Sequence, residues 1–117
     1  MTEVTVLIKN RIVSIEASGH AGFADHGEDI VCAAISVLVQ TAVNSLEKVA
    51  DISANHIIVE MHEDGYMYIE LPANLKETQQ SKAEVVLRTV LTGLEGIAEA
   101  YPKYMKLYKR EVQTYND

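Results

Sequence analysis

The first part of the chain alternates apolar and polar residues with the period of two that a half-buried strand produces. Residues 3–17 are rich in Val, Ile and Thr and are interrupted only at Lys9-Asn10-Arg11. This pattern predicts two strands joined by a tight hairpin, the second of which ends at Ser18-Gly19.

A second hairpin is predicted near the middle of the chain. Residues 56–61 and 66–71 alternate around Glu63-Asp64-Gly65, and an Asp-Gly pair is a strong short-range signal for a hairpin turn. Pro72 ends the second of these strands. Residues 103–112 alternate more weakly, and we interpret them as a fifth strand.

Two other segments have the three- and four-residue spacing of helices. The first helix is predicted over residues 29–50. Its opposite face is also apolar, so we expect it to lie at the centre of the domain or in a subunit interface. Ser81 followed by Glu84 matches a capping box and predicts a second helix over residues 82–101, which Pro102 stops.

The predicted order ββαββαβ gives the fold class α+β. We expect a two-layer sandwich in which a mixed sheet of about five strands carries two helices on one face. The length of 117 residues suits a single domain over residues 1–112, followed by a frayed tail over residues 113–117. Between the second strand and the first helix, residues 20–28 have two glycines and no apolar period, which predicts a long loop.

Charge and composition exclude several classes of protein. Ten Lys and Arg against seventeen Asp and Glu give a net charge of −7, which argues against direct binding of nucleic acid. The one dense basic stretch, Lys103–Arg110, is interpreted as a half-solvated strand. The apolar stretch Ile30–Val43 is interrupted by three polar residues and falls short of the roughly 20 residues that a membrane span needs. With one cysteine and no secretory signal at the start, we expect a cytoplasmic protein without disulfides.

Cys32 is the only soft nucleophile in the sequence. It follows Asp29, a good N-cap residue, which would place the thiol in the first turn of a helix, where unpaired N–H groups favour negative charge. His20 comes earlier in a glycine-bearing loop that could fold back and bring an imidazole beside the sulfur. The residues alone leave open whether Cys32 is a catalytic nucleophile or a small buried hydrophobe.

A zinc site is a rival interpretation of the same segment, because His20, His26 and Cys32 are three potential ligands. The spacing argues against it, since structural zinc sites usually pair ligands about two to four residues apart and use about four protein ligands. We therefore predict no metal. His26 is interpreted as a solvated loop residue, and His56 and His62 as structural residues on a strand.

The segment Gly19-His20-Ala21-Gly22, followed by Gly27-Glu28-Asp29-Ile30-Val31-Cys32-Ala33-Ala34 and by Ser36, resembles the signature of the bacterial ribosomal-processing cysteine protease Prp family. The likeness includes the spacing from histidine to cysteine, the aspartate three residues before the cysteine and the serine four residues after it. The chain length, the order of elements and the Tyr101-Pro102 dipeptide ahead of a short strand are also similar to the family.

This resemblance implies a cysteine endopeptidase that removes the N-terminal extension of the large-subunit ribosomal protein numbered twenty-seven during ribosome assembly. Its cleavage site would follow a pair of aromatic residues and precede a small one. Cys32 would be the nucleophile and His20 the general base and later the general acid, through a thioester intermediate and without a cofactor. Backbone N–H groups at the start of the helix, including that of Cys32, would stabilise the oxyanion. The resemblance also implies a homodimer.

Asp29 and Ser36 are predicted to support the site, and the sequence leaves open whether Asp29 holds the imidazole, holds the loop or caps the helix. Phe23 is expected to pack on the substrate or on a partner subunit. The expected substrate loop comprises Gly19, Ala21, Gly22, Phe23 and Gly27. An alternative function is a non-catalytic ribosome-assembly factor that binds the same ribosomal protein and keeps the Cys-His pair only for packing.

Overall fold

The protein folds into one sheet covered on one side by helices. The computed structural model describes residues 1–19 and 26–113, with only the backbone of His26. Within these residues five strands and two long helices follow in the order ββαββαβ, with a short 3₁₀ helix ahead of the third strand. The elements are β1 (Thr2–Lys9), β2 (Arg11–Ser18), α1 (His26–Lys48), the 3₁₀ helix (Ala54–His56), β3 (Ile58–Met61), β4 (Met67–Glu70), α2 (Glu77–Ala100) and β5 (Met105–Glu111).

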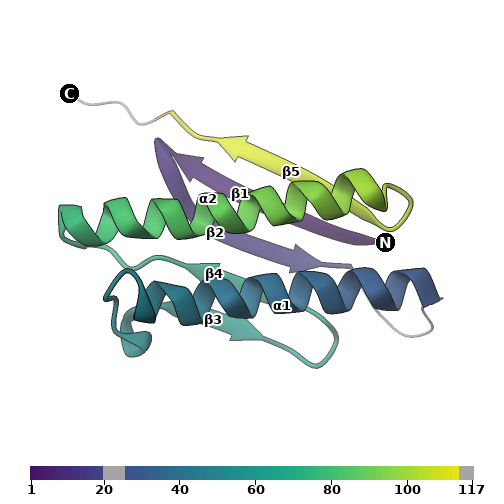
Figure 1. Ribbon diagram of the computed structural model, residues 1–117, viewed down its shortest axis with the longest axis horizontal. Coiled ribbons are helices and arrows are strands. Elements are labelled where there is room, and N and C mark those ends of the chain that lie inside the picture. The colour runs from purple at the N-terminus through teal and green to yellow at the C-terminus, as the bar shows by residue number, and fades with distance from the viewer. Residues whose placement is uncertain (20–25, 114–117) are drawn as a thin grey trace.

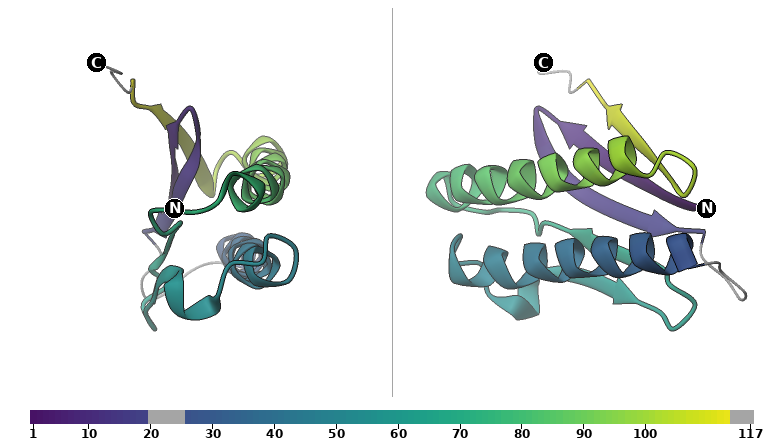
Figure 2. Two further views of the ribbon diagram at one scale, coloured as in Figure 1. Left: turned by 90° about the vertical axis from the view of Figure 1, so that its left-hand side faces the viewer. Right: turned by 45° about the vertical axis from the view of Figure 1, so that its right-hand side comes forward.

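The strand order in the sheet is β3-β4-β2-β1-β5 (Figure 1). All neighbouring pairs are antiparallel except β1 and β5, which are parallel. Both helices lie on the same face of the sheet, as the end-on view in Figure 2 shows. The predicted α+β sandwich, its mixed sheet and the order of its elements are therefore confirmed.

Both predicted hairpins are present. Asn10 joins β1 to β2 with a φ of 65°, a left-handed conformation that asparagine tolerates better than most residues. In the second hairpin Gly65 has a φ of 95°, and the carboxylate of Asp64 accepts the backbone N–H of Tyr66. The strand prediction for His56 and His62 is wrong: His56 lies in the 3₁₀ helix, where its N–H bonds to the carbonyl of Ser53, and His62 lies in the turn after β3.

The core lies between the sheet and the two helices. Alternate residues of β1 and β2 point to the helices, and residues at helical spacing on α1 and α2 meet them. Each fully buried aliphatic side chain contributes roughly 1.5–3 kcal/mol relative to exposure. The largest contributors include Val4, Val6, Ile12, Ile15, Val31, Ile35, Leu46, Ile69, Leu87 and Leu94.

The start of α2 differs from the prediction. The helix begins at Glu77, and the Gln79 side chain accepts the N–H of Lys76 at 3.0 Å, so the first turn is closed five residues ahead of the predicted cap. Ser81 lies inside the helix and donates to Glu77. Glu84 instead accepts the N–H of Ile12 at 3.0 Å, beside the irregularity in the β1–β2 ladder, and so ties the helix to the sheet.

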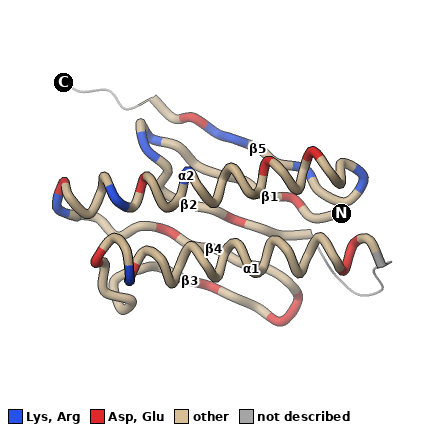
Figure 3. Tube along the Cα trace, in the orientation of Figure 1, with Lys and Arg blue, Asp and Glu red and all other residues tan. Residues whose placement is uncertain are grey.

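The outer side of α1 is apolar and uncovered. The helix has no charged residue between Asp29 and Glu47 (Figure 3), and Ile30 and Val37 are 43% and 64% exposed. Contrary to the sequence-based expectation, residues 27–48 are long and apolar enough, with a mean hydropathy of 1.6, to span a membrane. Core helices pass the same test, and the opposite side of α1 is buried in this core.

Candidate active site

Cys32 lies in the first turns of α1, against the start of β1. The N-terminus and the start of α1 lie at the right-hand side of the molecule in Figure 1. The Oγ1 atom of Thr2 is 3.3 Å from the Sγ atom of Cys32 and 3.4 Å from the Oε1 atom of Glu28. The amino group of Met1 forms an ion pair of 2.9 Å with the same Oε1 atom. Thr2 and Glu28 are buried, whereas Cys32 is a free, half-buried cysteine. The thiol therefore sits against a buried polar network, on a residue that is itself partly exposed.

The position of Cys32 within α1 corrects the sequence analysis. The helix begins at His26, so Cys32 is its seventh residue and lies in the second turn. Only about the first four N–H groups of a helix lack an intrahelical acceptor, so the N–H of Cys32 is not a free donor for an oxyanion. Asp29 likewise lies inside the helix and is not its N-cap. The extra turn brings Glu28 into the network around the thiol.

Two glycines of the predicted substrate loop are needed for packing. Gly19 has a φ of 106°, and a Cβ atom there would lie 2.6 Å from the carbonyl oxygen of Met1. The prediction that Gly27 belongs to the loop is wrong, because Gly27 lies in the first turn of α1. A Cβ atom on Gly27 would lie 2.6 Å from the ring of Tyr104, so its lack of a side chain lets that ring pack over the helix start.

The remaining predicted site residues are distributed as follows. Asp29 is exposed, and its side chain makes no hydrogen bond or ion pair with another described residue. Ser36 is half-buried one turn beyond Cys32, on the same side of α1. The predicted residues His20, Ala21, Gly22 and Phe23 lie outside the described residues.

The structure adds three residues that the sequence analysis did not find. Glu28 lies in the segment that resembles the family signature, and an acid near the predicted nucleophile was a usable signal. Tyr104 lies in the basic stretch Lys103–Arg110. No sequence signal marked Thr2, because a threonine at the start of a strand is ordinary. Only the packing of the start of β1 against α1 brings its hydroxyl to the thiol. The Thr2 N–H bonds to the Tyr104 carbonyl at 2.9 Å, where β1 meets β5.

The rival zinc site needs ligands that the structure does not describe. Among the described residues no group of three His, Cys, Asp or Glu side chains could hold a metal ion. His20 and the side chain of His26 lie outside them. His56 and His62 are exposed, and the ring of His62 packs edge-on against Tyr66.

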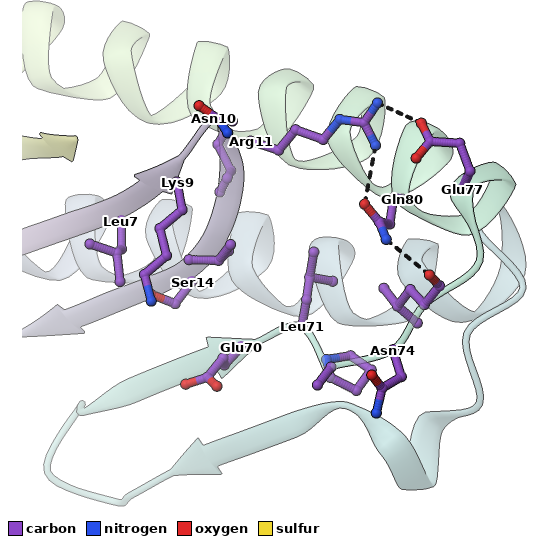
Figure 4. A pocket seen from close by; sticks show the side chains of 15 residues that line it. Leu7, Lys9, Asn10, Arg11, Ser14, Glu70, Leu71, Asn74, Glu77 and Gln80 are labelled. Carbon is purple, nitrogen blue, oxygen red and sulfur yellow. Dashed lines mark hydrogen bonds and ion pairs between the residues drawn. The ribbon is translucent and has the colours of Figure 1, made fainter. Parts of the chain in front are cut away.

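A hollow of about 600 Å³ lies at the opposite end of the sheet from Cys32. Figure 4 shows it between the β1–β2 turn and the segment that joins β4 to α2. Arg11 spans one side and donates to Glu77 at 2.8 Å and to Gln80 at 3.5 Å. Its lining has no cysteine or histidine, so we do not assign the predicted Cys-His chemistry to this hollow.

The chain is similar to proteins of one family throughout. The family model for cysteine protease Prp matches residues 1–106. The ribosomal processing cysteine protease Prp of Bacillus subtilis is 34% identical over 97 residues, which cover 82% of this chain and 84% of that protein. The chain belongs to the cysteine protease Prp family.

Solved structures agree with this Prp assignment. The crystal structure of SMU.848 from Streptococcus mutans has a TM-score of 0.82 and 32% identity, and the match covers 96% of both chains. The ribosomal processing protease Prp of Staphylococcus aureus, solved with a covalently linked product peptide, shares the fold, with a TM-score of 0.75 and 23% identity over 94% of this chain and all of that one. This member of the Prp family is therefore a cysteine protease, which counts against the alternative of a non-catalytic assembly factor.

Proposed function

We propose that this protease removes the N-terminal extension of the large-subunit ribosomal protein numbered twenty-seven during ribosome assembly in the cytoplasm. The observation that carries the proposal is the 34% identity with the Bacillus subtilis protein, whose name describes ribosomal processing. It is strengthened by the segment from Gly19 to Ser36, which resembles the family signature without a departure at a motif position. The net charge of −7 also suits a basic ribosomal protein as substrate.

We propose that Cys32 is the nucleophile and His20 the general base. The sulfur attacks the scissile carbonyl while His20 takes the thiol proton, and the oxyanion collapses as His20 returns that proton to the leaving amine. The N-terminal extension then remains on Cys32 as a thioester, which a water molecule activated by His20 hydrolyses. The half-buried state of Cys32 supports this role, because a nucleophilic residue must not be wholly enclosed by the core.

Cleavage of the extended ribosomal protein tests this proposal. The intact mass of the substrate should fall by the mass of the extension after incubation with the wild-type protein. It should stay unchanged with Cys32→Ala, which should remain folded by circular dichroism. A substrate whose aromatic pair is replaced by alanine should be cut much more slowly. Binding of the ribosomal protein without any cleavage would favour the non-catalytic assembly factor.

We also propose that the protein is a homodimer that buries the uncovered side of α1. The support is the stretch of α1 without charge, on which Ile30 and Val37 are exposed to solvent. The edge strand β3 also exposes Val59 and Met61, which pair with the buried Ile69 and Met67 and so point to the helix-covered face of the sheet. Exposed apolar patches of this kind are characteristic of protein interfaces.

Matched substitutions on the two helices test the dimer. Val37 on α1 and Val85 on α2 are 64% and 66% exposed, so a charge at either position has a similar cost in the monomer. Sedimentation analysis should give a dimer for the wild type and for Val85→Glu, and a monomer for Val37→Glu. A wild-type monomer at all concentrations, or a dimer that is unaffected by Val37→Glu, would contradict this proposal.

A further inference from the structure

Thr2, at the start of β1, places its hydroxyl against the thiol of Cys32. It is 4% exposed, and its hydroxyl lies between Cys32 and Glu28, at 3.3 Å from the sulfur and 3.4 Å from the carboxylate. Its backbone is held in the sheet, since its N–H bonds to the Tyr104 carbonyl and β1 lies between β2 and β5. The hydroxyl is therefore held between a thiol and a carboxylate.

A hydroxyl group has one proton and can donate to only one of these two neighbours at a time. When it donates to Glu28, the contact with the sulfur requires the thiol to be the donor, which gives the chain S–H to Oγ1–H to carboxylate. When the sulfur is a thiolate, it can only accept, so the hydroxyl must turn from Glu28 to the sulfur. Glu28 keeps the ion pair with the Met1 amino group in both states.

We propose that Thr2 is a positioning residue that donates a hydrogen bond to the thiolate of Cys32 and thereby favours the reactive form. This inference rests on the proposed role of Cys32 as nucleophile and adds a residue to it. A hydrogen bond to a charged acceptor is stronger than one between neutral groups. The burial of Thr2 excludes water from competing for its hydroxyl.

Other charged groups also act on the sulfur. Glu28 from α1 is negative and opposes the thiolate, while the Met1 amino group is positive and offsets Glu28. Asp29 lies on the exposed side of the helix, and Lys103 lies over the ring of Tyr104, 5.7 Å from its centre. A test of Thr2 must therefore change the hydroxyl and leave these charges in place.

The substitution Thr2→Val meets this condition, because valine keeps the branched shape and removes only the hydroxyl. The measurement is the rate of alkylation of Cys32 by iodoacetamide as a function of pH, on the whole folded chain. We expect the profile of Thr2→Val to move to higher pH, with a rate at pH 7 about tenfold below that of the wild type, from the strength of a charge-assisted hydrogen bond. Thr2→Ser keeps the hydroxyl and should stay within about twofold of the wild type.

Two controls distinguish an effect on the Cys32 thiol from a defect in folding and from a failure of the proposed substrate. If Thr2→Val does not fold by circular dichroism, Thr2→Ala replaces it and is compared with Thr2→Ser in the same way. Equal alkylation profiles for the wild type and the hydroxyl-free variant would overturn the proposal for Thr2. Alkylation needs no peptide substrate, so a shifted profile without cleavage of the ribosomal protein would refute the proposed substrate and leave the role of Thr2 intact.

Discussion

The ring of Tyr104 packs directly over Gly27 in the first turn of α1. A methyl group on Gly27 would lie 2.6 Å from two atoms of the ring and 2.9 Å from its hydroxyl oxygen. The carbonyl of Tyr104 also accepts the N–H of Thr2. Tyr104, just ahead of β5, therefore contacts both the helix that carries Cys32 and the strand that carries Thr2. The side chain of Thr2 in turn contacts the sulfur of Cys32.

Replacing Gly27 by alanine should destabilise the protein. Within a helix this exchange is normally favourable by about 0.5–1 kcal/mol, but here the added methyl group forces the ring or the helix to move, at a cost of about 1–3 kcal/mol. Gly96 provides the control, because a Cβ atom there has nothing within 4 Å. Urea unfolding should show that Gly96→Ala is neutral or stabilising and that Gly27→Ala is less stable than the wild type.

A double-mutant cycle identifies the cause. With Tyr104→Ala in the background, the effect of Gly27→Ala should become like that of Gly96→Ala, with a coupling free energy of about 1 kcal/mol or more. An unchanged penalty in that background would show that the ring does not cause the loss.

Replacing His20 by alanine should remove activity and slow the alkylation of Cys32, since the imidazole both transfers the proton and stabilises the thiolate. We expect a loss of about 100-fold or more in kcat/KM, as for other general bases. His56 and His62 are exposed and lie on other elements, so alanine at either position should change kcat/KM by about twofold at most; His26→Ala should also have a much smaller effect than His20→Ala. Normal alkylation in His20→Ala would show that the imidazole does not act on the sulfur.

The exposed face of the sheet gives a prediction at alkaline pH. The hydroxyl of Tyr66 donates to Glu16 at 2.7 Å, and this hydrogen bond raises the pKa of Tyr66 to about 12. Because the folded pKa lies above the ordinary value of 10, the interaction stabilises the fold fully below about pH 10 and is lost as the pH rises through about 12. The stability of the wild type should therefore fall over this range more steeply than that of Tyr66→Phe.

Absorbance titration of tyrosinate measures the same group directly. Glu16→Gln should move the titration of Tyr66 back toward pH 10. The pKa of Tyr68, which is raised chiefly by its hydrogen bond to Glu70 and only slightly by the charge of Glu16, should fall much less. A titration curve that is identical in the wild type and in Glu16→Gln would contradict the assignment.

Local sequence signals predicted the strands well and the helix starts poorly. The Lys9-Asn10-Arg11 and Asp64-Gly65 turns form where predicted, because their backbone conformation suits the residues present. Asp29 and Ser81 have side chains typical of caps, yet both lie inside helices. The actual start of α2 depends on Gln79 closing the turn on Lys76, and lysine is not a residue that propensity favours at that position.

The site was predictable in its chemistry and not in its surroundings. Cys32 and Glu28 lie in one short segment, so their proximity follows from the helix alone. Thr2 and Tyr104 lie far from them in the chain. Thr2 reaches the thiol because β1 packs against α1, and Tyr104 reaches Gly27 from the turn ahead of β5, which pairs in parallel with β1. The periodicity of a single segment does not show which distant segments it will contact.

The most direct test of Cys32 as nucleophile is the mass of the protein itself during turnover. After brief incubation with the extended ribosomal protein and an acid quench, a fraction of the wild-type enzyme should carry the N-terminal extension as a thioester, on the peptide that contains Cys32. The adduct should disappear on treatment with hydroxylamine and should be absent from Cys32→Ala. Cleavage of the ribosomal protein by Cys32→Ala at the wild-type rate would contradict the account.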